Sequence, residues 1–93
     1  MPEVIRLQVI FMKEGETAIV HSPALDLSGY GHNLEDANKD FHSAVTIFLD
    51  ECKKNGTLDE AFTTLGWKQI DHHWQPQIEV ISSGKVEEFS LPR

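Results

Sequence analysis

The segment His21–Ala37, HSPALDLSGYGHNLEDA, constrains the fold more than any other part of the chain. Pro23 cannot donate a backbone hydrogen bond, so a strand that enters this segment should stop there. Asn33 stands at the N-cap position of a helix, and Glu35 and Asp36 follow in the first turn, where the helix dipole favours acids. The segment therefore predicts a strand, a tight turn and a capped helix in close succession.

Two glycines, Gly29 and Gly31, flank Tyr30 just before this helix. Glycine is favoured where the backbone needs a positive φ angle or where another backbone approaches closely. Residues 28–32 are expected to add a short third strand that leads directly into the helix.

The residues before this segment predict a β-hairpin. Arg6, Gln8 and Ile10 alternate with apolar residues along the first strand, which gives one continuous apolar face formed by Ile5, Leu7, Val9 and Phe11. Residues 14–16 make a short turn, and residues 17–21 return as the second strand.

The residues after this segment predict one long helix and one short helix. The long helix should end at Asn55 and Gly56. Its apolar residues recur at steps of three and four and form one stripe that packs on the sheet: Leu34, Ala37, Phe41, Ala44, Val45, Phe48, Leu49 and Cys52. Thr57 with Glu60 predicts a capping box at the start of the second helix, which Gly66 ends.

From Trp67 onward the apolar pattern returns to that of strands. Residues 67–74 are expected to form one strand of mixed exposure, and residues 77–81 and 86–91 a hairpin around a loop at 82–85. The expected fold is α+β: an antiparallel sheet of a hairpin plus a third strand, packed by one long helix, with a second short helix and C-terminal strands. We expect a single domain over residues 1–93, with a β-β-β-α-α core at 1–66 and a C-terminal strand extension at 67–93.

The charge balance limits the classes of partner. Fifteen acidic residues against eight Lys and Arg give a formal charge of -7, which argues against a nucleic-acid surface. An acidic chain suits a basic protein partner, and the same charge also serves solubility alone. No stretch has the length of a membrane span and no signal peptide is visible, so we expect a cytoplasmic protein without membrane contact. Cys52, the single cysteine, is expected to be a buried structural thiol.

No catalytic set, metal site or cofactor site is predicted. The glycines at 28–32 lack the spacing and the lysine of a phosphate-binding loop. His72 and His73 are neighbours that point to opposite faces of a strand, so structural histidines are the preferred interpretation. Four residues remain as candidates for binding a partner, by residue type and expected exposure: Tyr30, His32, His72 and Trp74. For Trp74 the alternative is packing against the C-terminal hairpin.

Six residues give the chain a family resemblance: Pro23, Leu25, Gly29, Gly31, Glu35 and Ala37. Together they resemble the motif of the HicB-like antitoxins of bacterial toxin-antitoxin systems, and the likeness extends roughly from Val4 to Trp67. It implies a partial ribonuclease H-like fold in which these six residues are structural. It also implies a protein that is no enzyme and that neutralises a small basic ribonuclease toxin of the HicA type by covering its active site.

The resemblance has two departures. Where family members often have a Gly and Cys pair, this chain has Gly29 and Tyr30. Many members carry a C-terminal helix-turn-helix or ribbon-helix-helix module, whereas this chain shows strand periodicity after Trp67. No direct DNA binding is therefore expected.

The sequence also allows an expectation about the oligomeric state and two other functions. Because the family commonly self-associates and the C-terminal strands offer an edge, we expect a homodimer or a higher homo-oligomer. The chain could instead be a solitary HicB-like interaction or oligomerisation domain without a toxin. A residual metal-dependent nuclease is the weakest alternative, since Arg6 and Gln8 stand where the first strand would need an acid.

Overall fold

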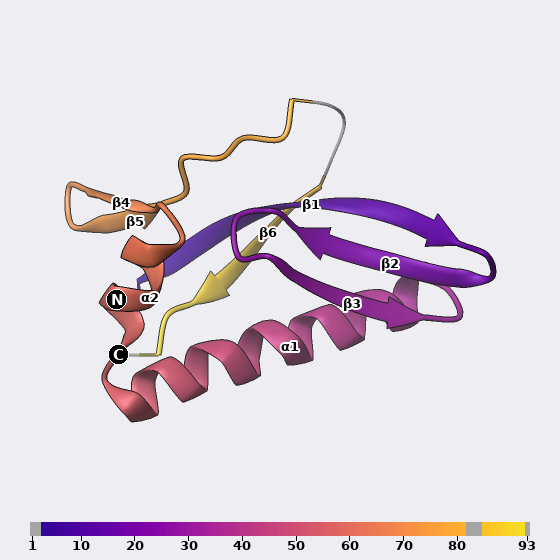
Figure 1. The fold of residues 1–93 in the computed structure, drawn as a ribbon, viewed down its shortest axis with the longest axis horizontal. Coiled ribbons are helices and arrows are strands. Elements are labelled where there is room, and N and C mark those ends of the chain that lie inside the picture. The colour runs from indigo at the N-terminus through magenta and orange to yellow at the C-terminus, as the bar shows by residue number, and fades with distance from the viewer. Residues whose placement is uncertain (1–2, 82–84, 93) are drawn as a thin grey trace.

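The longest strand, β1 (Val4–Glu14), joins two staggered ladders. In the computed structural model, which describes residues 3–81 and 85–92, its second half pairs with β2 (Thr17–Ser22) and its first half pairs with β6 (Lys85–Ser90). With β3 (Leu27–Gly31) beside β2, the strand order of this antiparallel sheet is β3-β2-β1-β6. Figure 1 shows the stagger, with β2 and β3 at one end of β1 and β6 at the other.

The predicted first hairpin is confirmed. Its two-residue loop joins Glu14 to Thr17, which are the last pair in the register. Gly15 has a φ of +59°, which is what the first central position of a type II′ turn requires. Because this turn type matches the twist of paired strands, the hairpin continues straight to its tip.

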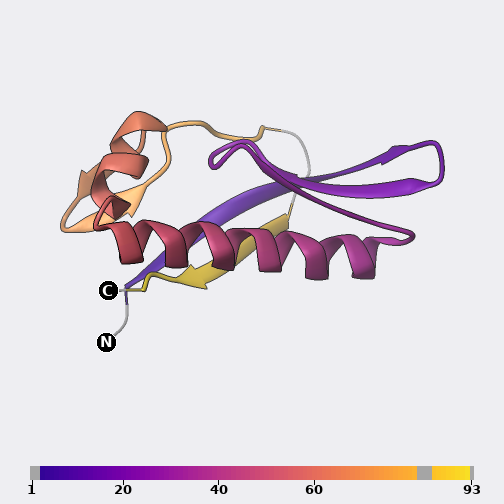
Figure 2. The same ribbon diagram turned by 60° about the horizontal axis from the view of Figure 1, so that its bottom comes forward.

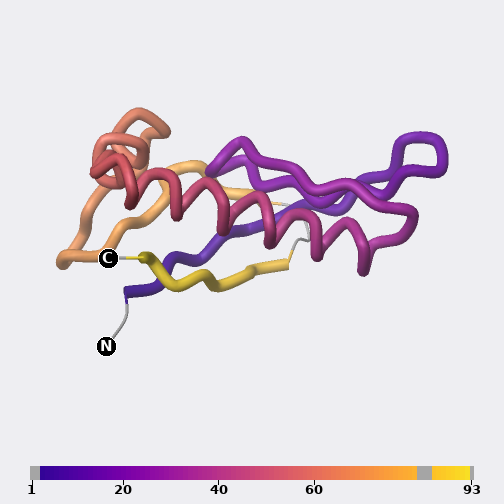
Figure 3. Tube along the Cα trace, turned by 90° about the horizontal axis from the view of Figure 1, so that it is seen from below, coloured from indigo at the N-terminus to yellow at the C-terminus, as the bar shows by residue number. Residues whose placement is uncertain are grey.

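Helix α1 (Leu34–Asn55) lies along one face of the sheet and packs mainly on β3 and β2 (Figure 3). The side chain of Asn33 caps it by accepting a hydrogen bond from the backbone nitrogen of Asp36, at 2.8 Å. Gly56 ends it with a φ of +67°. The predicted start, length and end of this helix are confirmed.

The core lies between α1 and the sheet. The side chains that fill it come from alternate positions of the strands and from one stripe of the helix: Ile5, Leu7, Val9, Val20, Ala37, Phe41, Val45 and Leu49. Cys52 is buried at the end of this stripe, as predicted. Phe11 and Leu34 belong to the same two series, yet they are 45% and 49% exposed.

A buried carboxylate interrupts this apolar core. Glu87 of β6 pairs with Leu7 in the register and is 7% exposed. The imidazole Nε2 of His42, on α1, contacts Glu87 Oε2, and Lys85 Nζ lies 3.6 Å from Glu87 Oε1. The His42 ring also packs against Phe89, with ring centroids 4.7 Å apart. These contacts tie α1 to β6.

The six motif residues take structural positions. Gly29 and Gly31 lie against the backbone of α1, Ala37 is fully buried beneath them, and Leu25 is 3% exposed. Pro23 stands in the turn between β2 and β3, and Glu35, in the first turn of α1, forms an ion pair with Lys39.

Helix α2 (Leu58–Thr64) is present, but the capping box predicted at its start is wrong. Thr57 precedes the helix, yet its side chain makes no capping hydrogen bond. Its backbone φ of -114° and ψ of 16° lie away from the extended conformation that N-cap residues usually adopt. The backbone carbonyl of Thr57 accepts from the nitrogen of Ala61 instead, at 2.8 Å.

The single strand predicted over residues 67–74 is also wrong. Two short strands, β4 (Lys68–Ile70) and β5 (His73–Gln75), form a small separate hairpin there. Asp71 and His72 between them have φ angles of +52° and +66°. Only a few per cent of residues other than glycine adopt positive φ angles; Asp and His do so more often than most, but still in the minority of cases, so these residue types alone do not identify the turn.

Three aromatic residues of the same hydrophobic core pack against one another at α2. The ring centroid of Phe62 lies 4.6 Å from that of Trp67 and 5.4 Å from that of Trp74. The Trp67 indole nitrogen donates to the backbone carbonyl of Ala24 at 2.9 Å, and the Trp74 indole nitrogen donates to Asp59 Oδ1 at 3.0 Å. These contacts join α2 and the β4–β5 hairpin to the turn after β2.

The C-terminal hairpin predicted from residues 77–81 and 86–91 does not form. Residues 77–81 are not a strand, and β6 pairs with β1. The side-chain amide of Gln8 holds the segment instead: Gln8 Nε2 donates to the carbonyl of Val80 at 3.2 Å, and the nitrogen of Val80 donates to Gln8 Oε1 at 2.8 Å. Of the predicted loop, residues 82–84 lie outside the described residues.

The part of the chain predicted as an extension thus contributes to the main sheet. β6 follows β1 in the strand order (Figure 1), and just after β6 the nitrogen of Leu91 donates to the carbonyl of Glu3 at 2.7 Å. Among the described residues, no helix combines the length and the hydrophobicity needed to cross a membrane.

Candidate partner-binding surface

The face of the sheet opposite α1 carries an exposed apolar row across three strands. Tyr30 of β3 pairs with Ile19 of β2, and Ile19 pairs with Met12 of β1. Tyr30 is 57% exposed, Met12 is 41% exposed and Ile19 is half-buried. We call this surface, formed by Met12, Ile19, Tyr30 and their same-face neighbours, the open face.

The next row across the open face is more polar. His21 pairs with Ser28 on one side and with Ile10 on the other. His21 Nδ1 and Ser28 Oγ are 2.7 Å apart and hydrogen-bonded. Beyond this row the backbone of Val80 is hydrogen-bonded to the side chain of Gln8 on β1, so the open face extends from there to the tip of the hairpin.

The position of Tyr30 follows from its two glycine neighbours. Because Gly29 and Gly31 press β3 against α1, the side chain between them must point to the other face. The backbone nitrogen of Tyr30 also donates to Asp40 Oδ2 of α1, at 2.9 Å. The Tyr30 ring is therefore exposed, whereas its backbone is held by the ladder with β2 on one side and by Asp40 on the other.

The rim of the open face is charged at the hairpin end. The ion pair between Arg6 Nε and Glu88 Oε2, at 2.9 Å, lies on the same side of the sheet but beyond the segment held by Gln8, outside the open face. Glu14, which is exposed, ends β1 on the same face as Met12. An apolar centre with a polar and charged rim is the usual composition of a protein interface.

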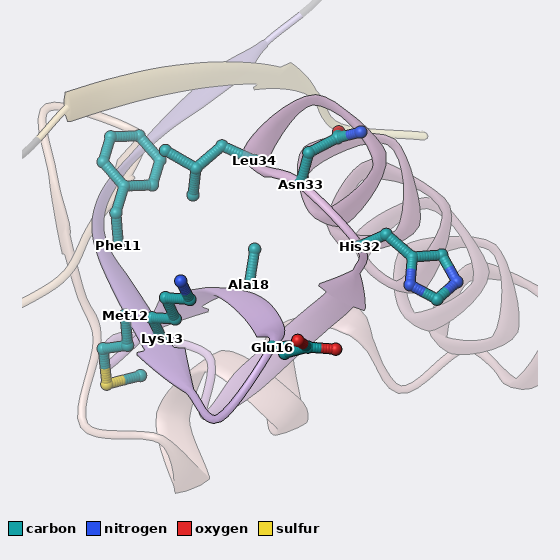
Figure 4. A pocket seen from close by; sticks show the side chains of 8 residues that line it. All are labelled: Phe11, Met12, Lys13, Glu16, Ala18, His32, Asn33 and Leu34. Atoms are coloured by element: carbon teal, nitrogen blue, oxygen red, sulfur yellow. The ribbon is translucent and has the colours of Figure 1, made fainter.

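A shallow pocket lies on the other face, between the hairpin and the start of α1 (Figure 4). Its cavity is about 390 Å³. The side chains of Phe11 and Leu34 lie next to each other on one side of it, Ala18 lies on the opposite side, and the His32 ring points away from it. In Figure 2 the β1–β2 hairpin extends beyond the first turn of α1, so no described element covers the two half-exposed apolar side chains.

A second pocket lies at the opposite end of the molecule, between the start of β1 and the β4–β5 hairpin. Its cavity is about 660 Å³, and Glu3, Arg6, His72, His73 and Trp74 contribute to its lining. His72 and His73 are both exposed. Among residues 3–81 and 85–92, no group of three or more His, Cys, Asp and Glu side chains could hold a metal ion.

The four predicted partner-binding residues do not form one site. Tyr30 and His32 lie near the start of α1, and His72 and Trp74 lie in the β4–β5 hairpin at the far end (Figure 1). Tyr30, His32 and His72 are exposed. The expected exposure of Trp74 is wrong: the residue is 8% exposed because Phe62 covers its ring. Its packing partner is α2, rather than a C-terminal hairpin.

The sequence alone did not predict the rest of the open face. Ile19 and Met12 lie beside Tyr30 because of the register in which the three strands pair, and the sequence of one strand does not determine that register. A signal was nevertheless present, because Ile10 and Met12 make the second face of β1 apolar towards its end.

Comparison with protein-family models, with curated proteins and with solved structures finds no match.

Proposed function

We propose that this chain is a HicB-like antitoxin that binds and neutralises a small basic ribonuclease toxin of the HicA type by covering its active site. The protein performs no chemistry in this role. It acts in the cytoplasm and does not bind DNA directly. The ribonuclease H-like classification of its α+β fold is part of the same proposal and is supported by the succession of β1, β2, β3 and α1.

The observation that carries the proposal is the apolar row of Tyr30, Ile19 and Met12 on an acidic chain. Exposed apolar patches mark interaction surfaces, and Tyr and Met are enriched in interfaces. The formal charge of -7 favours a basic partner and speeds its association. Tyr30 is the proposed anchor, since its backbone is already fixed and little conformational entropy is lost on binding.

A second function is a solitary interaction or oligomerisation domain. One observation favours this function: among the described residues, no strand pairs with residues 10–14 of β1 on the side where β6 pairs with the first half of β1. Such a strand edge can pair with another chain. A residual metal-dependent nuclease has no comparable observation in its favour.

The proposal is tested by using the tagged full chain as bait in extracts of its native cells. Each small basic protein that is retained is identified by mass spectrometry and then assayed for RNA cleavage with and without the chain. Recovery of a ribonuclease that the chain silences supports the antitoxin. Recovery of the chain alone supports the solitary domain, and metal-dependent RNA cleavage by the chain itself would support the nuclease.

A further inference from the structure

A groove lies between α1, α2 and the turn that joins β2 to β3, and its cavity is about 450 Å³. Figure 2 shows α2 and this turn on the same side of α1, beside its second half. The apolar part of the lining consists of Leu25 of the turn, Phe48 of α1, and Ala61 and Leu65 of α2 and its C-cap. Thr57, Glu60 and Thr64 complete the lining. We call this surface the helix groove.

Small side chains on α2 leave the helix groove unfilled. Thr57, Ala61 and Thr64 follow one another at steps of four and three residues, so they share one face of the helix. Ala61 and Phe48 pack against the core from its edge and stay partly accessible, and Leu65 is 37% exposed. The groove therefore presents apolar side chains to solvent, which is typical of interaction surfaces.

Hydrogen bonds join the three walls of the helix groove. Trp67 Nε1 donates to the carbonyl of Ala24 at 2.9 Å and so ties the end of α2 to the turn after β2. At the other end of α2, the nitrogen of Thr57 donates to the carbonyl of Cys52 of α1, at 2.9 Å. Because the walls are already fixed, a partner that enters the groove needs to order little of this chain.

Acidic residues stand on all three walls. Glu60 of α2 lines the groove, Asp26 follows Leu25 in the turn, and Glu51 lies three residues after Phe48, on the same side of α1. All three acids are exposed, and within residues 3–81 and 85–92 none of them forms an ion pair. The described residues that line the groove include no Lys, Arg or His. The helix groove thus favours a partner that is both apolar and positively charged.

The walls also determine the shape of the partner segment. The backbone groups of α1 and α2 are hydrogen-bonded within each helix, so they offer no edge to which a partner strand could add. An apolar groove beside helices instead accepts the apolar face of an amphipathic helix, whose anchoring side chains recur at steps of three and four residues.

We propose that the helix groove binds an amphipathic helix of another protein, with apolar side chains in the groove and with Lys or Arg beside them, opposite Asp26, Glu51 and Glu60. Since α1 covers one face of the sheet and the open face is the other, a helix bound here leaves the open face accessible. The chain then has two separate docking surfaces. This proposal does not depend on the antitoxin proposal, and its test uses no toxin.

The probe is a synthetic peptide of about 18 residues, long enough to form a helix, with Leu at steps of three and four and Lys elsewhere. Fluorescence anisotropy measures its binding to the full chain, and chemical-shift changes of the backbone amides locate it. We expect the largest changes at Phe48, Ala61 and Leu65. A peptide of the same composition, with Leu spread around the helix, should bind about tenfold more weakly or less. Equal binding of the two peptides, or shift changes centred elsewhere, overturns the proposal.

Two variants test the groove itself, and circular dichroism checks that each folds. Ala61→Leu fills the groove without a change of charge, so it should weaken binding of the probe about tenfold and leave stability at least as high as that of wild type. Glu60→Lys should weaken binding about fivefold more than Asp50→Lys does. Asp50 is an exposed residue of α1 outside the helix groove, and its replacement changes the net charge equally. Unchanged binding in Ala61→Leu, or equal effects of the two lysine variants, overturns the proposal.

A second copy of the chain is the other possible occupant of the helix groove. Sedimentation equilibrium compares the mass of the free wild type with that of Leu65→Asp, which places a charge in the groove. We expect the same mass for both. A lower mass for Leu65→Asp would show that a second copy covers the groove, and would overturn the proposal.

Discussion

A Cβ atom built on Gly29 would lie 2.2 Å from the backbone nitrogen of Phe41, closer than such atoms ever come. At Gly31 the nearest atom would be the backbone nitrogen of Ala37, at 2.5 Å. These two glycines let β3 lie directly on the backbone of α1, and they turn Tyr30 between them to the open face. The contact therefore links the family motif to the surface proposed to bind a partner.

Gly29→Ala should destabilise the protein by about 3 kcal/mol or more, because the added methyl group forces two backbones apart. Gly15→Ala is the control: nothing lies within 4 Å of its Cβ position, and only the φ of +59° opposes the substitution, at a cost of about 1 kcal/mol. Urea unfolding measures both. Equal losses would contradict the close contact between β3 and α1.

Trp74→Ala should lower stability by about 3–5 kcal/mol, since it empties the space against Phe62. Ile70→Ala, in the same hairpin but 44% exposed, should cost less than about 1 kcal/mol. Thermal unfolding followed by circular dichroism distinguishes the two. A Trp74→Ala variant that unfolds at the same temperature as the wild type would contradict the burial of this indole against Phe62 and favour an exposed, partner-binding role for it.

Gln8→Met should release the segment around Val80, because it removes both side-chain hydrogen bonds at nearly constant volume. We expect faster hydrogen exchange at the Val80 amide and a stability loss of about 1–2 kcal/mol. Arg6→Met, two residues away on the same face, removes only an exposed ion pair and should change stability by about 0.5 kcal/mol or less. Unchanged exchange at Val80 in Gln8→Met would show that the segment is held by other contacts.

His42→Leu should destabilise the protein by about 1–3 kcal/mol, because the buried carboxylate of Glu87 then loses the side chain on α1 that contacts it. Because an apolar pair can replace a buried polar pair, the double variant with Glu87→Leu should recover most of this loss. A double-mutant cycle in urea measures the coupling. Additive losses would mean that the two side chains contribute independently.

The sequence predicted the elements that depend on local signals. Asn33 and Gly56 set the ends of α1 by their capping chemistry, and Gly15 marked the first turn. The glycines before the helix also indicated a close approach, although the sequence could not say which backbone approaches.

The elements missed depend on long-range contacts or unusual backbone angles. The β4–β5 turn uses positive φ angles at Asp71 and His72, which Asp and His adopt more often than most residues but still in the minority of cases. β6 pairs with β1 across more than seventy residues, and the Gln8 side chain takes the place of a ladder for residues 77–81. The open face was only partly visible, because Tyr30, Ile19 and Met12 are brought together by register.

The most direct test of the central claim measures RNA cleavage by the small basic ribonuclease that the chain retains from its native cells, as three forms of the chain are added. We expect wild type and Ile47→Asp to silence it at equal amounts. Tyr30→Asp should be about thirtyfold weaker, because it removes the proposed anchor. If wild type leaves cleavage unchanged, the antitoxin proposal fails. If wild type silences the enzyme and Tyr30→Asp does so equally well, the toxin binds elsewhere than on the open face.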